Sequence, residues 1–361
     1  MHYRIPVPSS SLPRNSTTQL PTLKDTLNQI RDLDNPMRNV TVLSPKHPFI
    51  TPDDPQQPTL IMSILNITPD SFSDGGKLSP ADTDMIVATA ASHISSGATI
   101  LDVGGQSTRP NSTMLSVEEE LGRVLPALRA IRTIPEVASG QITISLDTFY
   151  SDVARRCIEE GLVDIINDIS AGQLDPKMLS TVAELGKTIV LMHMRGTPQT
   201  MGNMTDYGRK GIVTGVADEV AQRVNEALAA GILPWRIILD PGIGFAKNQQ
   251  QNLKLLRAGT RLIASVQRYD LGHYPWLVGT SRKGFIGKVT MTADPNERVW
   301  GTAACVTAAV AGGAQILRVH DVEEMSKVVK MADALYRFEK ETYQKEKMKV
   351  KKTSTEQLKV E

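Results

Sequence analysis

Eight short apolar runs in the sequence each end in polar or ionisable side chains that could take part in binding or catalysis. The run ends are, in chain order, Asn66, Asp102, Asp147, Asn167 with Asp168, His193, Asp240, Ser281-Arg282-Lys283, and Arg318 with His320. Asn, Asp and Ser are ordinary turn residues, but a turn does not require His, Arg or Lys. The repeated pattern therefore predicts that the run ends meet in one functional site.

The acidic members of this set indicate a ligand that is rich in hydrogen-bond donors. Asp102, Asp147, Asn167 and Asp240 stand among Leu, Ile and Val, so we expect their side chains in apolar surroundings. A buried carboxylate is unfavourable unless it is paired or hydrogen-bonded. A nitrogen-rich heterocycle would supply the donors, although loop amides or Lys283 could do the same.

The basic members indicate an anionic group on the same ligand. Lys283, Arg318 and His320 close the last two runs. Arg presents a planar fork of donors to an oxyanion, and Lys presents a point charge. The glycine-rich stretches "DSFSDGGK" and "GGQSTRP" could bring backbone N–H groups to the same place. We therefore expect a substrate with a donor-rich ring and a phosphate arm.

The runs that carry these residues predict a parallel β-sheet. They span 60–68, 99–105, 142–148, 163–170, 188–194, 236–245, 275–283 and 315–321, and helical patterns separate them. Continuous apolar strands that alternate with helices are typical of a parallel sheet covered by helices. Eight repeats predict closure into a (β/α)8 TIM barrel, an α/β fold whose strand ends converge on one rim. A doubly wound open sheet is the alternative, but no G-x-G-x-x-G follows the first run.

Composition argues against several classes of function. The 361 residues carry a formal net charge of +1, so no overall field attracts nucleic acid or an anionic membrane. No apolar run reaches the roughly 18 residues that would span a membrane. Cys157 and Cys305 lie far apart without metal-ligand spacing, which favours buried thiols in a reducing compartment. We expect no nucleic-acid or membrane partner and a cytoplasmic location.

The two ends of the chain differ from its regular middle. Residues 1–57 are rich in Pro, Ser, Thr and Asn, and we expect a largely irregular leader or linker with one candidate helix at 23–33. The lack of acidic residues before Asp25 is weakly typical of a transit peptide and leaves a mitochondrial location open, but several prolines disfavour its amphipathic helix. Residues 339–361 are expected to form a charged tail, which leaves 58–338 as the catalytic domain.

Eight motifs occur in order between about Thr59 and Arg337: "ILNITPDSFSDGG", "DVGGQSTRP", "SLDT", "NDIS", "LMHMRG", "LDPGIGF", "GTSRKGFIG" and "RVHDV". Together they resemble dihydropteroate synthase, the folate-pathway family inhibited by sulfonamides. A motif such as "SLDT" says little alone, whereas the first motif together with "SRK" and "RVHDV" is specific. The resemblance implies a transferase that condenses 6-hydroxymethyl-7,8-dihydropterin diphosphate with 4-aminobenzoate, giving 7,8-dihydropteroate and diphosphate, with Mg²⁺ as cofactor.

The resemblance also implies a role for each matching residue. The implied pterin contacts are Asp147, Asn167, Met192, Asp240 and Lys283. The implied diphosphate contacts are Asn66, Thr108, Arg318 and His320, with Asn66 as the metal ligand. The implied 4-aminobenzoate contacts are Phe72, Thr108, Arg109, Pro110, Phe245 and Lys283. The implied catalytic residues are Lys283, Arg318, His320 and Asp74. Because an arylamine is already neutral at pH 7, stabilisation of the departing diphosphate would matter more than a general base.

Three features depart from many bacterial members of the family. Gln106 stands where many have Glu, residues 259–275 enlarge the segment before the seventh run, and the leader is long. Fungal synthases are commonly part of longer multifunctional folate proteins, so we expect a similar origin here and association with other folate-pathway enzymes. A homodimer is expected from the family, although 259–275 could alter its interface.

Two other functions fit parts of the pattern. A pterin-dependent methyltransferase barrel would keep the pterin-binding acids but would have no use for a diphosphate clamp. A non-catalytic, synthase-like subunit would be expected to lose Asn66, Lys283, Arg318 or His320, and all four are present.

Overall fold

Eight parallel strands form one sheet that closes on itself. The computed structural model describes residues 41–44, 50–52, 54, 57–68, 78–107, 112–266 and 271–337. The strands are β1 (Leu60–Asn66), β2 (Ile100–Gly104), β3 (Thr143–Asp147), β4 (Ile165–Asp168), β5 (Thr188–Met192), β6 (Ile237–Asp240), β7 (Leu277–Val278) and β8 (Ile316–Val319). Their order is β6-β5-β4-β3-β2-β1-β8-β7, and a parallel bridge between Leu239 and Trp276 joins the two edges. The expected (β/α)8 barrel is confirmed.

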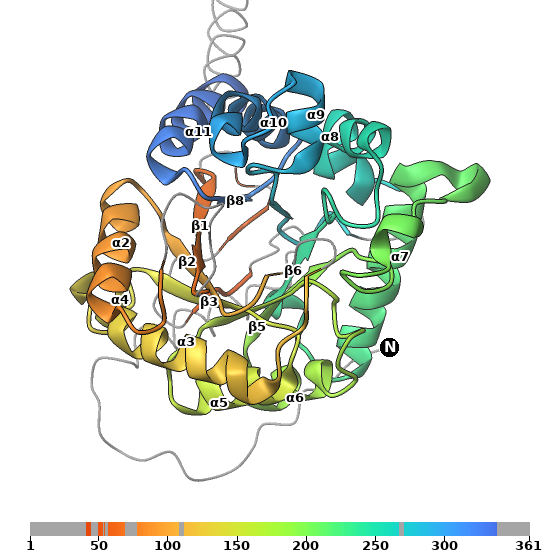
Figure 1. Ribbon diagram of the computed structural model, residues 1–361. Helices are drawn as coiled ribbons and strands as arrows, with labels where there is room; N and C mark the ends of the chain where they lie inside the picture. Colours follow the sequence, from red (N-terminus) through yellow and green to blue (C-terminus); the bar gives the residue numbers. More distant parts are fainter. Residues whose placement is uncertain are drawn as a thin grey trace, which may run out of the picture. The chain divides into compact units, whose positions relative to one another are not determined.

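Helices surround the strands, as Figure 1 shows. They are α2 (Thr83–Ser95), α3 (Val117–Ile131), α4 (Pro135–Ala138), α5 (Ser151–Glu159), α6 (Met178–Leu185), α7 (Gly211–Ala229), α8 (Gln249–Ala264), α9 (Gly284–Thr290), α10 (Val299–Ala311) and α11 (Val322–Tyr336). Short 3-10 turns lie at Met201–Asn203, Gly208–Lys210, Pro234–Arg236 and Pro295–Arg298. Capping boxes begin α3 at Ser116 and α8 at Asn248, where each cap satisfies amides that the first helical turn leaves unpaired.

The strands are short and aliphatic because both of their faces are covered. One set of side chains packs outward against the helices in the main core. A second set fills the barrel and includes Leu60, Met62, Ile100, Ile165, Val190, Ile238, Leu277 and Ile316. Alternation along a strand sends neighbouring residues to opposite faces, so a continuous apolar run serves both layers.

A segment upstream of β1 completes the inner core. Leu43 and Ile50 are buried in the same cluster as the barrel-filling residues. Thr41 and Ile50 pair as an antiparallel bridge, and the Val42 amide donates to the Trp235 carbonyl at 2.9 Å. These contacts place the segment with the barrel, in the unit that runs from Asn39 onward. Two apolar side chains of the stretch 1–57, which was expected to be a leader, thus pack in the core of the barrel.

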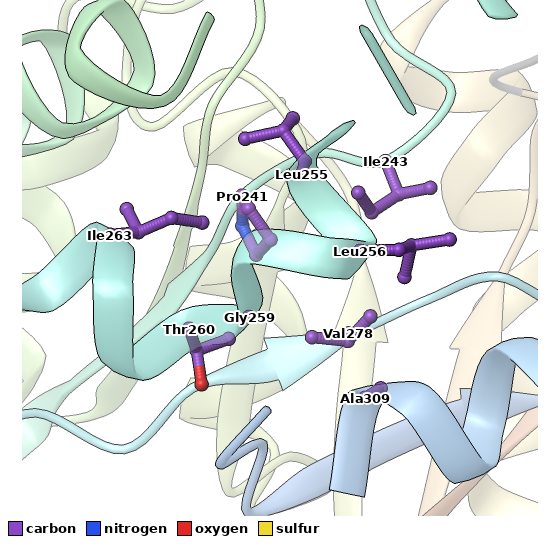
Figure 2. A pocket seen from close by; sticks show the side chains of 9 residues that line it. All are labelled: Pro241, Ile243, Leu255, Leu256, Gly259, Thr260, Ile263, Val278 and Ala309. Carbon is purple, nitrogen blue, oxygen red and sulfur yellow. The ribbon is translucent and has the colours of Figure 1, made fainter. Parts of the chain in front are cut away.

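Helix α8 contains a sharp bend where it crosses α10. Gly259 has φ +71°, and a Cβ atom there would lie 2.6 Å from the Cα of Gly312. Figure 2 shows the small cavity beside this crossing, lined mainly by apolar side chains of α8, β7, α10 and the segment after β6. Its volume of about 10 Å³ is close to the minimum for one water molecule, so it is not a substrate site.

Several expectations lie outside the described residues. These are the candidate helix at 23–33, most of the leader and the tail from residue 338 onward. Within the described part of the chain, no helix combines the length and the apolar character needed to cross a membrane.

Candidate active site

The carboxyl ends of the strands bring the predicted acidic residues to one level of the barrel. Sheet register places Asp147 beside Gly104 on one side and Asn167 on the other, and places Asp240 beside Met192. These residues are far apart in the sequence, and the parallel register of the eight strands brings them to the same level. The sequence-based prediction of a shared rim is therefore correct in its geometry.

Arg318 on β8 links two of these acids. Its Nε donates to Oδ2 of Asp102 at 2.6 Å, and its Nη2 donates to Oδ2 of Asp147 at 2.6 Å. Ser145 and Asn167 also donate to Asp102, at 2.6 and 3.1 Å. Asp102 is fully buried, so these charge-assisted bonds compensate its lost hydration. It is the structural centre of the network.

Asp147 differs from Asp102 because one of its oxygens is unused. Its Oδ1 is buried and has no hydrogen-bond partner among the described residues. Burial, together with the nearby charges of Asp102 and Asp168, raises the pKa of Asp147 to about 7, although Arg318 opposes the rise. A buried acceptor without a donor is unfavourable, so this oxygen is suited to receive a donor from a ligand.

Lys283 follows β7 and lies near the second accessible acid, Asp240. Burial lowers the pKa of Lys283 to about 8, and the charge of Asp240 opposes this shift. Burial raises the pKa of Asp240, while Lys283 and the Gly242 amide, which donates to Oδ1 at 2.7 Å, oppose that rise. Lys283 Nζ also donates to the Ile243 carbonyl and lies 4.7 Å from the centre of the Phe245 ring. Lys283 thus lies between Asp240 and an aromatic side chain, Phe245.

An apolar cluster lies beside these acids and Lys283. Met192 is buried with Phe149, Ile169 and Met194, and Phe245 packs against this group. Met192 ends β5, the other three buried residues lie one or two positions past a strand, and Phe245 lies in the loop after β6. The arrangement provides apolar side chains beside the acids, which suits a ring system with polar edges.

His320 and Asn66 occupy the ends of β8 and β1. The Ser281 hydroxyl lies 3.0 Å from His320 Nδ1, and it accepts a hydrogen bond from the His320 amide at 3.1 Å. Asn66 is partly exposed at the last position of β1. Both residues therefore stand on the rim that carries Arg318 and Lys283.

Three polar residues at strand ends have structural partners instead. Asp168 accepts from the Ser170 amide and hydroxyl and from the Gly172 amide, so it holds its own turn. Arg282 pairs with Asp321 at 2.5 Å and donates to Asn296. His193 points to Glu219 on α7, with Nε2 and Oε2 3.0 Å apart. At these three strand ends the side chains therefore bind other parts of the protein, which departs from the expectation that every strand end contributes to one functional site.

The departure at Gln106 has a physical explanation. Its Nε2 donates at 2.5 Å to Oε2 of Glu120, a buried residue of α3. Burial raises the pKa of Glu120 to about 7, a shift that hydrogen bonds from Thr148 and Gln106 oppose. A glutamate at 106 would place two carboxyl groups in contact, whereas Gln supplies the N–H that Glu120 requires.

Five predicted site residues lie outside the part of the chain that the structure describes. They are Phe72, Asp74, Thr108, Arg109 and Pro110.

Conversely, the sequence analysis missed Ser145 and Lys247. Ser145 lies two residues before Asp147 and therefore on the same strand face, a signal that period-two alternation could have supplied. Lys247 follows the "PGIGF" stretch and is buried, which its charge alone would not indicate.

Comparisons with known proteins agree with this geometry. Residues 62–320 match the family described as pterin binding enzyme. The chain is 47% identical over 279 residues to a dihydropteroate synthase of Synechocystis sp., covering 77% of this chain and 91% of that protein. A Burkholderia cenocepacia dihydropteroate synthase solved with 7,8-dihydropteroate superposes with a TM-score of 0.67 at 34% identity, covering 80% and 93% of the two chains.

A fungal relative is considerably longer than the matched region. The folic acid synthesis protein fol1 of Pneumocystis carinii is 46% identical over 281 residues, which cover 78% of this chain. The aligned part spans only 36% of the length of that relative. The shared region is the barrel that carries the rim described above, and the chain belongs to the dihydropteroate synthase family.

Proposed function

We propose that this protein is a dihydropteroate synthase. It joins the methylene carbon of 6-hydroxymethyl-7,8-dihydropterin diphosphate to the amino nitrogen of 4-aminobenzoate. The C–N bond forms as the C–O bond breaks, the diphosphate leaves with the bonding electron pair, and the nitrogen loses one proton. The observation that carries the proposal is the buried cluster of Asp147, Asp240, Lys283 and Arg318, in which one Asp147 oxygen has no partner among the described residues.

The acidic floor would bind the pterin. Asp147 Oδ1 is the acceptor without a partner, Asn167 offers an amide beside it, and Asp240 lies across the barrel rim. A pterin edge carries several N–H donors, and its ring would lie against the apolar wall at Met192. These contacts would orient the methylene carbon without supplying chemistry of their own.

The diphosphate would be bound by Asn66, Arg318 and His320. The described residues contain no group of three or more His, Cys, Asp or Glu that could hold a metal ion. Mg²⁺ commonly uses few protein ligands and takes its other oxygens from phosphate and water, so Asn66 fits as a single amide-oxygen ligand. When bound, Mg²⁺ would neutralise charge on the leaving group. Arg318 and His320 would donate to the same oxygens as negative charge develops there.

The aminobenzoate would bind beside Lys283 and Phe245. Lys283 Nζ is close to the Phe245 ring, so this pair offers a cation and an aromatic face to a benzoate. Thr108, Arg109, Pro110, Phe72 and Asp74 stay predictions from the family resemblance. Because aminobenzoate and sulfonamides share an aniline ring, the same face would take the inhibitor.

The proposed partners are small molecules and a second copy of the chain. The longer fungal relative supports association with other folate-pathway enzymes. Trp300 on α10 is 82% exposed and is a residue that a homodimer would cover. Light scattering would give the mass of the assembly.

The cytoplasm is the proposed location. Because the pea relative is named as mitochondrial, imaging of a full-chain fluorescent fusion is the appropriate test.

One assay tests the central proposal. Purified protein with Mg²⁺ should release diphosphate only when both pterin diphosphate and 4-aminobenzoate are present, and dihydropteroate should form in equal amount. A methyltransferase would release no diphosphate with this pair, and a non-catalytic subunit would bind the pterin without turnover. Either of those outcomes would overturn the proposal.

A further inference from the structure

A buried lysine lies directly behind the proposed aminobenzoate site. Lys247 is only 9% exposed, and its Nζ has three acceptors within 3 Å. It donates to the carbonyls of Gly242 and Phe245 at 2.8 Å each and lies 2.9 Å from His193 Nδ1. Three acceptors match the three N–H groups of an ammonium ion. None of these contacts is made to the residues that we assign to substrate binding, except through the Phe245 backbone.

His193 and Glu219 hold the lysine in place. Glu219 accepts from the Arg195 guanidinium and lies 3.0 Å from His193 Nε2. Burial would raise the pKa of Glu219, but hydrogen bonds from Arg195 and His193 outweigh it and lower the pKa to about 2. The ionised carboxylate therefore requires a proton on Nε2. That tautomer leaves Nδ1 as an acceptor for Lys247, and burial lowers the pKa of His193 to about 4, so the ring is neutral.

The loop that Lys247 closes carries two features of the site. Residues 241–246 leave β6 after Asp240, and Gly242 turns the chain with φ +64°, where any Cβ would lie 1.9 Å from the His193 carbonyl oxygen. The Ile243 carbonyl then accepts from Lys283, and the Phe245 ring lies beside the same ammonium group. Lys247 binds the carbonyls at Gly242 and Phe245, which bracket Ile243.

We propose that Lys247, held by His193 and Glu219, is a positioning residue that fixes loop 241–246 and through it the placement of Lys283 and Phe245. The proposal rests on the function proposed above in one respect: that function identifies 4-aminobenzoate as the substrate that binds beside Lys283 and Phe245. The pterin side depends less on the loop, because Asp147 and Asn167 are held by pairing of β3 with β4, and the loop reaches that side only through the Gly242 amide on Asp240 and through Lys283. Loss of Lys247 should therefore raise the KM for 4-aminobenzoate more than the KM for pterin diphosphate.

The test is steady-state kinetics of Lys247→Met in the full chain with both substrates varied. We expect the KM for 4-aminobenzoate to rise about tenfold or more and the KM for pterin diphosphate to change less than about threefold. Lys254→Met is the matched control, because Lys254 is an exposed residue of α8, and it should match the wild type. A merely structural role would lower the active fraction, and hence kcat, without changing the ratio of the two KM values.

A second variant keeps the proposal testable if Lys247→Met does not fold. Glu219 lies on α7, and its side chain is 33% exposed, so Glu219→Gln should fold. It removes the charge that fixes the His193 tautomer, and we expect a rise of about threefold in the KM for aminobenzoate. Glu226→Gln on the same helix is its control. An unchanged aminobenzoate KM in a folded Lys247→Met, or in Glu219→Gln if the first variant is insoluble, overturns the proposal. Wild-type protein without turnover would instead refute the proposed function.

Discussion

Substitution of Arg318 by Met tests whether the acidic floor is stabilised by one cation. Met is an unbranched apolar side chain shorter than Arg, and it cannot donate to Asp102 or Asp147, which lie 2.6 Å from the guanidinium nitrogens. Breaking a buried ion pair by removing one partner typically costs about 3–5 kcal/mol, because a charge is left uncompensated. We expect a loss of that size in the free energy of unfolding at pH 8. Activity should fall at least about a hundredfold, or roughly 2.7 kcal/mol in the transition state.

The loss of stability should depend on pH in a defined direction. The pKa of Asp147 is already raised to about 7 with Arg318 present, and without the cation it should rise further. An acid whose pKa is higher in the folded state binds more protons there, so stability falls as pH rises from the unfolded value through the folded one. The variant should therefore be less destabilised at pH 6 than at pH 8. The slope for one proton cannot exceed about 1.4 kcal/mol per pH unit.

Urea unfolding at the two pH values measures this effect. Arg129→Met is the control, because Arg129 makes an ion pair on the surface with Glu160 and should contribute at most about 1 kcal/mol. A loss below about 1 kcal/mol for Arg318→Met at pH 8 would contradict a buried, charge-dependent network. An equal loss at both pH values would contradict the link to Asp147.

Other predictions follow from the same structure. Pterin affinity, measured by calorimetry, should rise with pH through about 7 because the ionised Asp147 is the better acceptor, and Asp147→Asn should remove this dependence. Gln106→Glu should lose about 1–3 kcal/mol of stability at pH 8 and regain it at lower pH, where the pair with Glu120 shares a proton; no change in urea midpoint would refute this. Leu43→Ala should lower stability by about 2–5 kcal/mol, and deletion of residues 1–38 should leave the melting temperature within a few degrees of the full chain. Removing Mg²⁺ with EDTA should weaken pterin diphosphate binding at least about tenfold and leave the pterin alcohol unaffected.

The sequence predicted the frame of the site better than its internal bonds. Strand ends could be located because continuous apolar runs stop at polar residues, and closure of a parallel barrel then requires those ends to meet. The partners of Arg318 could not be inferred, since Asp102 lies 216 positions away in the chain. Arg318 was expected at the mouth as a phosphate clamp, and the structure shows it bonded to the acids as well.

Two other features were hidden for a local reason. Glu120 belongs to the run "EEE" at the start of α3 and looks like a solvated charge, yet packing turns it inward to Gln106. Leu43 and Ile50 lie among prolines in a stretch that is typical of a linker. Both cases depend on where a side chain points in three dimensions, which short-range sequence patterns do not encode.

The charges around Arg318 bear on the proposal that Mg²⁺ enters with the diphosphate. Among the described residues, three carboxyl groups interact with Arg318: Asp102, Asp147 and Asp240. The nearby cations are Arg318 and Lys283, so even a charged His320 would leave no excess of positive charge. A diphosphate that entered alone would therefore meet no net attraction from these groups. A diphosphate bound together with its own divalent cation avoids that difficulty. Arg318 is already bonded to Asp147, so it would contact both the acid that binds the pterin and the diphosphate.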